Sequence, residues 1–390
     1  MLYAATLCGQ NHSDYLMRGR ALIDNGKTDE AISWLSAAIE KSKESRLMLE
    51  RAEAHLIKGD HSAAIDDFNA SNNLAEFSGE YGLARIYALK GDVSTALYHL
   101  ERNLKSPFKK SEKEIILDPS FSLIENRSEW RQFWRKTWYG RDEQALSEIE
   151  YYASAGKIEE AKAILAELRR DYAGNEENIF AEALILSASA NYNEAVRLMT
   201  GLIKRSPDTE EYLRVLAEAQ ERSGNPAGAL STLSRLLENG TADAGILLKR
   251  AECYRKTGEF NKASEDIEKY LGLYPENKQA LRTAGKMAMA DGDNIKALEY
   301  FSRNLELHPD DPQCYLDRAN SYFSSKSWVW AVKDYSMSLD LQPDNGEVWL
   351  NKGISLLNSG KTDDACHDFR RSLKLGNKKA AELISRHCIR

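Results

Sequence analysis

The sequence has few of the residues that usually mark a specialised fold. Its 390 residues include only five cysteines, which are scattered, so a disulfide framework does not define the fold. No run of residues approaches the roughly 20 apolar residues that a membrane-spanning helix needs. Acidic residues outnumber basic ones and the net charge is −7. This balance argues against a general nucleic-acid-binding protein, which would need a basic surface.

The chain also lacks the short motifs that carry common chemistries. It contains no phosphate-binding loop, no nucleophile elbow, no HExxH motif and no pairs of cysteines with zinc-ligand spacing. The nearest approach to a metal site is the pair of dipeptides Cys366–His367 and His387–Cys388, but neighbours in a helix point to different sides. We therefore predict a protein that is not an enzyme and that uses no cofactor or metal.

What the sequence has instead is an internal repeat. Between residues 142 and 377, seven alanines recur every 34 residues without drift. They are Ala161, Ala195, Ala229, Ala263, Ala297, Ala331 and Ala365. A fixed period of this size marks a chain built from stacked supersecondary units, none of which buries its apolar face alone.

Residues 242–276 show what one unit contains. Apolar residues at helical spacing lead to Gly258, and a second helical pattern around Ala263 ends at Pro275. Glycine adopts the left-handed conformation past a helix end at little cost. Proline stops a helix because it lacks the amide donor. Each unit is therefore predicted to be a helix, a glycine turn and a second helix.

This pattern resembles that of the tetratricopeptide repeat family. The last repeat carries the resemblance most fully, with Trp349, Gly353, Gly360, Ala365 and Phe369 at the expected places. The resemblance implies an all-α fold, a right-handed α-solenoid of about ten helix–turn–helix repeats. It also implies a concave groove, lined by the first helix of each pair, that binds protein.

The pattern divides the chain into five segments. Residues 1–11 precede the repeats, and residues 12–103 hold three looser repeats. Residues 104–141 break the pattern as a divergent insert, and residues 142–377 hold the seven regular repeats. Residues 378–390 are expected to form a helix that caps the last apolar face.

The N-terminal residues 1–11 are open to two interpretations. One is the end of a secretory leader with a cleavage point near Gly9–Gln10, although no basic segment precedes the short apolar run. The other is a frayed N-terminal tail. A leader would place the protein in the periplasm or cell envelope, and the alternative location is the cytoplasm.

The insert is rich in aromatic residues, for which we expect a divergent helix pair. Ser128 is a candidate N-cap for a helix on which tryptophans recur every fourth residue. The aromatic residues are Trp130, Phe133, Trp134 and Trp138. Three interpretations are open: they pack against the flanking repeats, form an exposed surface for a partner, or lie at a membrane surface.

The ninth repeat departs from the pattern at its turn. Lys326 replaces the usual glycine, and a non-glycine residue in the left-handed conformation carries a strain cost. We therefore expect a rearranged turn that leaves Trp328 or Trp330 partly exposed. Trp328 joins the insert aromatics as a candidate contact residue.

By the resemblance, certain exposed positions on the first helices form the partner-binding groove. These positions hold Arg214, Lys249, Arg255, Arg282, Lys286, Asn320, Phe323 and Asn351. The middle of this stripe is basic although the whole protein is acidic. We expect it to bind an extended acidic or C-terminal peptide, with Asn320 and Asn351 holding the peptide backbone. The alternative is that these are ordinary solvated side chains.

The function predicted from the sequence is a non-catalytic scaffold or adaptor that holds one or more partner proteins. The repeat blocks, aromatic insert and candidate leader loosely resemble repeat proteins of bacterial cell envelopes. That resemblance suggests a periplasmic subunit of an outer-membrane or secretion assembly, with peripheral membrane association compatible with it. The alternative is a cytosolic adaptor or co-chaperone-like regulator.

Overall fold

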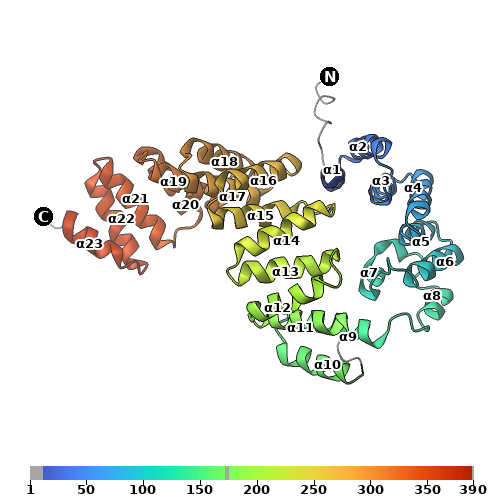
Figure 1. The fold of residues 1–390 in the computed structure, drawn as a ribbon. Coiled ribbons are helices and arrows are strands. Elements are labelled where there is room, and N and C mark those ends of the chain that lie inside the picture. The colour runs from blue at the N-terminus through green and yellow to red at the C-terminus, as the bar shows by residue number, and fades with distance from the viewer. Residues whose placement is uncertain (1–11, 172–174, 389–390) are drawn as a thin grey trace. The chain divides into compact units, whose positions relative to one another are not determined.

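The computed structural model describes residues 12–171 and 175–388, and the predictions for residues 1–11 lie outside them. Within these ranges the regular structure consists of 23 α-helices and one 3-10 helix, with no strand (Figure 1). The predicted all-α repeat fold is confirmed. None of the described helices is long and apolar enough to cross a membrane.

Three antiparallel helix pairs come first in the chain. They are α1 (His12–Asp24) with α2 (Thr28–Lys41), α3 (Ser45–Lys58) with α4 (His61–Leu74), and α5 (Glu80–Leu89) with α6 (Val93–Leu104). The insert follows as α7 (Glu112–Leu117), the 3-10 helix η1 (Pro119–Phe121) and α8 (Ser128–Phe133).

Seven further pairs and one last helix complete the chain. The first four pairs are α9 (Arg141–Ser154) with α10 (Ile158–Asp171), α11 (Glu176–Ala188) with α12 (Tyr192–Ile203), α13 (Glu210–Arg222) with α14 (Pro226–Glu238), and α15 (Gly245–Thr257) with α16 (Phe260–Leu273). The others are α17 (Lys278–Asp291) with α18 (Asn294–Leu307), α19 (Pro312–Ser324) with α20 (Trp328–Leu341), and α21 (Gly346–Asn358) with α22 (Thr362–Lys374), followed by α23 (Lys379–His387).

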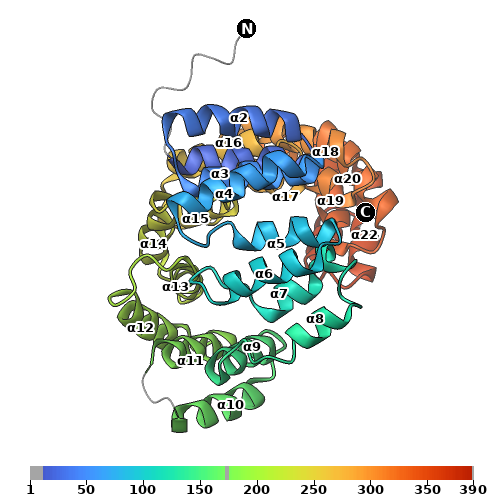
Figure 2. The same cartoon turned by 90° about the vertical axis from the view of Figure 1, so that its right-hand side faces the viewer.

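The contacts divide the chain into two compact units, Met1–Ile246 and Leu247–Arg390, which we call unit 1 and unit 2. The boundary falls inside α15, near its start. Figure 2 shows the helices from a second direction.

The periodic alanines lie where the two helices of each pair come closest. All seven have no exposed surface, and the same is true of Ala31, Ala64 and Ala96 in the first three repeats. The facing position on the first helix is small in most repeats for the same reason, although it is Ile149 opposite Ala161. A Cβ atom on Gly285 would lie 2.4 Å from the Phe301 ring, and one on Gly353 would lie 2.6 Å from the Phe369 ring. The bulky residue of the second helix therefore fills the space that the small residue leaves.

Local chemistry sets where each helix begins and ends. The Asp293 side chain accepts the Lys296 N–H at the start of α18, which satisfies one of the unpaired donors of the first turn. Gly258 takes a φ of +81° after α15, and the next amide, of Glu259, bonds back to the Tyr254 carbonyl at 2.8 Å. This closure satisfies carbonyls that the helix end would leave unpaired.

The turn of the ninth repeat is regular, so the prediction of a rearranged turn is wrong. Lys326 itself takes the left-handed conformation, with a φ of +57°. Its amide bonds to the Phe323 carbonyl and the Ser327 amide to the Tyr322 carbonyl, at 3.0 and 2.8 Å. These bonds hold the strained residue in place. The expected exposure is present, because Trp330 is 56% exposed.

A second periodic contact was not predicted from the sequence. In four repeats a basic residue of the first helix forms an ion pair with an aspartate 16 positions later on the second helix. The pairs are Arg51–Asp67 at 2.6 Å, Arg250–Asp266 at 2.7 Å, Arg318–Asp334 at 2.6 Å and Lys352–Asp368 at 3.2 Å. The aspartates are buried, so this interhelix pair satisfies charges that would otherwise be costly to bury.

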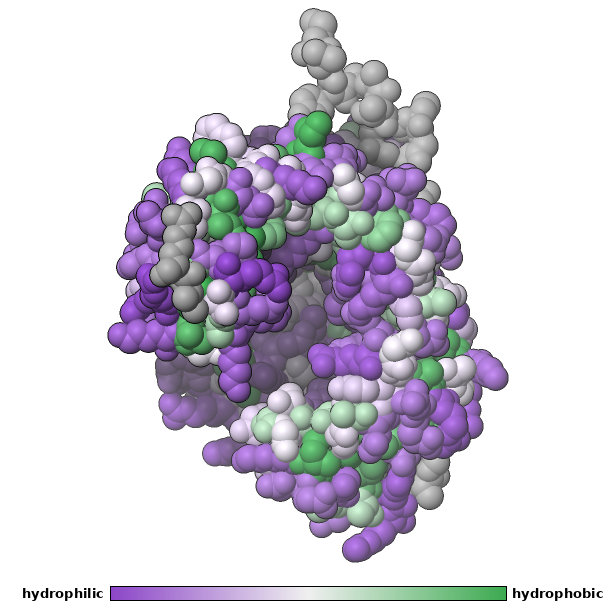
Figure 3. Space-filling view, turned by 90° about the vertical axis from the view of Figure 1, so that its left-hand side faces the viewer, coloured by the Kyte–Doolittle hydropathy of each residue, from purple (hydrophilic) through white to green (hydrophobic). Residues whose placement is uncertain are grey.

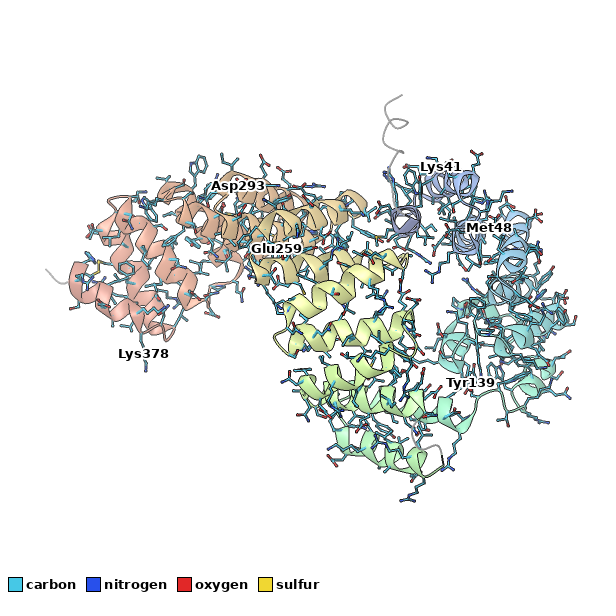
Figure 4. All side chains as sticks on the ribbon, viewed as in Figure 1. Lys41, Met48, Tyr139, Glu259, Asp293 and Lys378 are labelled. Carbon is cyan, nitrogen blue, oxygen red and sulfur yellow. A yellow bond between two sulfur atoms is a disulfide. The ribbon has the colours of Figure 1, made fainter. Side chains whose placement is uncertain are left out.

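The last helix, α23, covers the end of the final repeat. Leu383 and Ile384 pack against the buried cluster that contains Phe369. A disulfide joins Cys366 of α22 to Cys388, just after α23, and is drawn as a yellow bond in Figure 4. The sequence did not predict this bond. Because both thiols are used in it, they are not available as metal ligands.

Adding one methyl group at Gly285 tests the close approach of the helices. Gly285→Ala should lower the free energy of unfolding by about 1–3 kcal/mol, because Phe301 must leave its buried position. Gly272→Ala is the matched control, since a Cβ there meets no atom within 4 Å. That change should be neutral or stabilise by up to about 1 kcal/mol. Urea denaturation measures both, and equal effects would contradict the packing argument.

Removing one partner of an interhelix pair tests its contribution. Asp334→Ala should destabilise unit 2 by about 3 kcal/mol, because Arg318 is left largely buried without its carboxylate. Replacing both residues, as Arg318→Met with Asp334→Leu, should cost clearly less. Thermal and chemical denaturation provide the comparison. A double variant as unstable as the single one would show that the aspartate acts by another route.

Candidate functional site

The aromatic residues of the insert form a core rather than a contact surface. Trp130 and Phe133 are buried, and Trp134 and Trp138 are partly buried in the same cluster. Helix α8 ends at Phe133, so the predicted helix reaching Trp138 is wrong, and Ser128 is its first residue rather than its N-cap. The chain turns after Phe133 and brings the Trp138 ring back to 4.5 Å from the Phe133 ring.

This cluster is also anchored by polar contacts. The Trp138 indole donates to the Phe133 carbonyl at 2.9 Å, and the Tyr139 hydroxyl donates to the Lys110 carbonyl at 2.8 Å. Tyr139 is labelled in Figure 4. Burial raises the pKa of Tyr139 well above its ordinary value, so the hydroxyl stays protonated. The packing interpretation therefore accounts for these side chains without a partner or a membrane.

The three arginines among the candidate groove residues, Arg214, Arg255 and Arg282, form ion pairs with carboxylates of this chain. Arg214, in unit 1, binds Glu210 and Asp243, each at 2.6 Å. Arg255, in unit 2, pairs with Glu252 of the same helix at 2.6 Å. These contacts reduce the charge that either guanidinium offers to a partner.

Arg282 lies in a cavity of about 310 Å³ between α17 and α19. Its Nε atom is 2.6 Å from a carboxylate oxygen of Asp317, which is buried. Lys278 forms a second ion pair here, with Asp311. Because the cations and carboxylates of this cavity are paired with each other, an acidic peptide would have to compete with Asp317 for Arg282.

The same cavity contains a thiol without nucleophilic character. Cys314 is buried, and burial raises its pKa to about 11. At neutral pH it is therefore a protonated thiol, which is a poor nucleophile. Within residues 12–171 and 175–388 no group of three or more His, Cys, Asp or Glu side chains is placed to hold a metal ion.

Lys249 of α15 and Lys286 of α17 are the exposed cations of the predicted stripe. Neither forms an ion pair within the described part of the chain. They are the basic groups of this stripe in unit 2 that a carboxylate of a partner could approach without displacing another one.

The polar candidates of the last two full repeats converge on one buried tyrosine. The Tyr335 hydroxyl donates to Oδ1 of Asn320 at 2.8 Å, and the Asn351 side chain lies near the same hydroxyl. Burial raises the pKa of Tyr335 well above its ordinary value, while the nearby Asn351 amide acts to lower it. The structure thus brings together one asparagine from α19 and one from α21.

The aromatic candidates of the ninth repeat lie close to this group. Phe323 packs edge-on against Trp328 at 5.3 Å and against Tyr335 at 6.4 Å between ring centroids. Trp328 is partly buried by this contact, so Trp330 is the exposed indole of the pair. Figure 3 shows a face that is mostly hydrophilic with small hydrophobic patches.

Sequence reasoning missed Tyr335 as part of the site. It stands in the core position that holds phenylalanine in the neighbouring repeats, at Phe301 and Phe369. A hydroxyl at such a position must find a partner when it is buried. A tyrosine at a position that is otherwise apolar was therefore the signal in the sequence that could have identified it.

The chain belongs to the tetratricopeptide repeat family. The family model matches residues 16–79, 180–244 and 248–312, which together make up about half of the chain. Proteins of this family are interaction modules that are generally not catalytic, and the chain is accordingly a protein-binding repeat protein.

Several solved structures resemble parts of the chain. A tetratricopeptide repeat protein from Parabacteroides merdae ATCC 43184 is 18% identical, covers 63% of this chain and 98% of its own, and has a TM-score of 0.47. YrrB, described as a TPR protein with an unusual peptide-binding site, is 15% identical, with coverages of 48% and 97% and a TM-score of 0.41. MamA from Desulfovibrio magneticus RS-1 is 18% identical, with coverages of 43% and 94% and a TM-score of 0.40. A search of curated proteins finds no match.

Proposed function

We propose that this protein is a scaffold that holds an extended segment of a partner protein against the first helices α17, α19 and α21 of unit 2. The observation that carries the proposal is Asn320, held by the buried Tyr335 hydroxyl, with Asn351 of the next first helix near the same hydroxyl. Two fixed amide groups on neighbouring first helices suit recognition of a polypeptide backbone.

The Tyr335 hydroxyl orients the two amides differently. Its single proton goes to Oδ1 of Asn320, which leaves the Asn320 NH₂ group for a carbonyl of the partner. The proposal has the nearby Asn351 amide donate to the Tyr335 oxygen, which leaves Oδ1 of Asn351 for a partner N–H. A donor and an acceptor side by side match an extended peptide bond, whose own carbonyl and amide need both. Such a site would tolerate many side-chain sequences.

Charge would then add a preference to this backbone contact. Lys286 lies on α17 and is exposed, so it favours acidic residues in the segment that is held. Arg282 contributes less, because Asp317 already neutralises it. The proposed partner is therefore an extended segment with a modest acidic preference rather than a strongly acidic peptide.

The proposed setting is a protein assembly of the bacterial cell envelope. The disulfide between Cys366 and Cys388 supports this setting, since disulfides persist in oxidising compartments and are rare in the cytosol. The second candidate is a cytosolic adaptor, in which the two cysteines would be reduced.

Substitution of the asparagines tests the backbone site. Extended peptides that bind the protein are first selected from a random peptide library, and their affinities are then measured by calorimetry. Asn351→Ala should weaken all selected peptides by a similar factor of about 3–10, the value of one lost hydrogen bond. Lys286→Glu should weaken acidic peptides alone, and Lys374→Glu, an exposed change on the second helix α22, is the matched control. Unchanged affinities in Asn351→Ala would reject the site.

The redox state in the native host tests the setting. In a Cys8→Ser background, denatured protein from rapidly quenched cells should label with maleimide at Cys253 and Cys314 alone, because neither thiol is part of a disulfide. Cys366 and Cys388 should label only after reduction. Labelling of all four without reductant, together with recovery in the cytosolic fraction, would favour the second candidate.

A further inference from the structure

The loop between α14 and α15 interrupts the repeat pattern. Its Thr241 stands where the neighbouring repeats have Pro207 and Pro275, each 34 residues away. Thr241 is nevertheless buried. The residues that bury it include some from the opposite end of unit 1, more than 190 positions earlier in the chain.

The first helix reaches this loop directly. The Ser13 hydroxyl of α1 donates to the Thr241 carbonyl at 3.2 Å, and both residues are buried. Ala242 packs against the apolar cluster that contains Tyr15 and Leu16 of the same helix. Figure 1 shows α1 beside the end of α14.

The third helix adds a charged contact. The Arg46 guanidinium of α3 donates to the Asn239 carbonyl at 3.0 Å and to the Gly240 carbonyl at 3.2 Å. These carbonyls lie at the C-terminal end of α14, where unpaired acceptors and the negative end of the helix dipole favour a cation. Arg46 therefore caps a helix that belongs to a distant repeat.

Hydrogen bonds and an ion pair with α13, together with bonds inside the loop, hold the loop in this conformation. The Thr241 hydroxyl donates to Glu210 of α13 at 3.1 Å, and Arg214 binds Asp243. The Asp243 amide donates to the Thr241 hydroxyl at 3.2 Å. A hydroxyl at this position, in place of the proline ring, supplies these bonds.

We propose that these contacts form a latch in unit 1. In the closed state, Ser13 and Arg46 hold α1 and α3 against the loop of residues 239–244. In a second, open state, these contacts are broken. Arg46 is exposed, and both of its bonds in this contact are made to backbone carbonyls. Packing within each repeat does not depend on these bonds. The latch can therefore open while the repeats stay folded, and added salt shifts the balance toward the open state.

The experiment compares hydrogen exchange and the radius of gyration of the full-length protein and its variants. Ser13→Ala with Arg46→Ala should speed exchange of α1 and of residues 239–244 several-fold and increase the radius of gyration. Ala242→Arg should do the same from the other side of the contact, because it places bulk and like charge against Arg46 and the α1 cluster. Exchange in α18 to α22 should stay as in the wild type.

Lys43→Ala is the matched control, because Lys43 is an exposed basic residue three positions before Arg46. It should leave both measurements unchanged, and Arg46→Lys should give an intermediate result. Wild-type exchange and size in the two latch variants would overturn the proposal, and so would an equal effect of Lys43→Ala. Peptide affinity of unit 2 should not change in the latch variants, so failure here is distinguishable from failure of the proposed function.

Discussion

The close approach of two helices at a small residue is the constraint on which the rest of the structure depends. Every periodic alanine is completely buried, and the glycines at the facing position of α17 and α21 leave space that the Phe301 and Phe369 rings fill. Because the spacing is the same in each repeat, successive pairs stack in the same way. The surface of the first helices, and with it the candidate site, follows from that stacking.

The interhelix ion pairs fix how the second helix is rotated against the first. A buried aspartate such as Asp334 has to meet its arginine, so the second helix has one rotational setting in which the charge is satisfied. The neighbouring Tyr335 is then fixed as well, and its hydroxyl faces α19 and α21. A feature of the core thus positions Asn320 and Asn351 at the surface.

Most of the fold could be predicted from the sequence, because an alanine every 34 residues predicts the same helix–helix contact in each repeat. The helix pairs, their glycine turns and the all-α class followed from it, but the regular turn at Lys326 did not. The insert could not be predicted in detail: Trp130 and Trp138 have helical spacing, yet the chain turns after Phe133 and achieves the same burial in another way. The spacing of the aromatic residues predicts that they are buried, but four rings can be buried by more than one path of the chain.

The site was less predictable for a physical reason. The groove positions are known from the repeat register, but whether a charged residue there is available depends on partners from other helices. Arg282 is neutralised by Asp317, which lies 35 positions later, while Lys286 one turn away is exposed. In the same way, Lys326 tolerates a left-handed conformation because hydrogen bonds that the sequence does not display hold it there.

The disulfide has a consequence for how a linear array comes apart. Repeat arrays normally fray from their terminal helices, which have a neighbour on one side only. The bond between Cys366 and Cys388 closes a covalent loop across a separation of 22 residues. Because it restricts the unfolded chain, such a bond stabilises the folded state by about 3 kcal/mol. The C-terminal helix cannot peel away and diffuse off while that loop is intact. Unfolding of unit 2 therefore begins in the interior of the array rather than at its end.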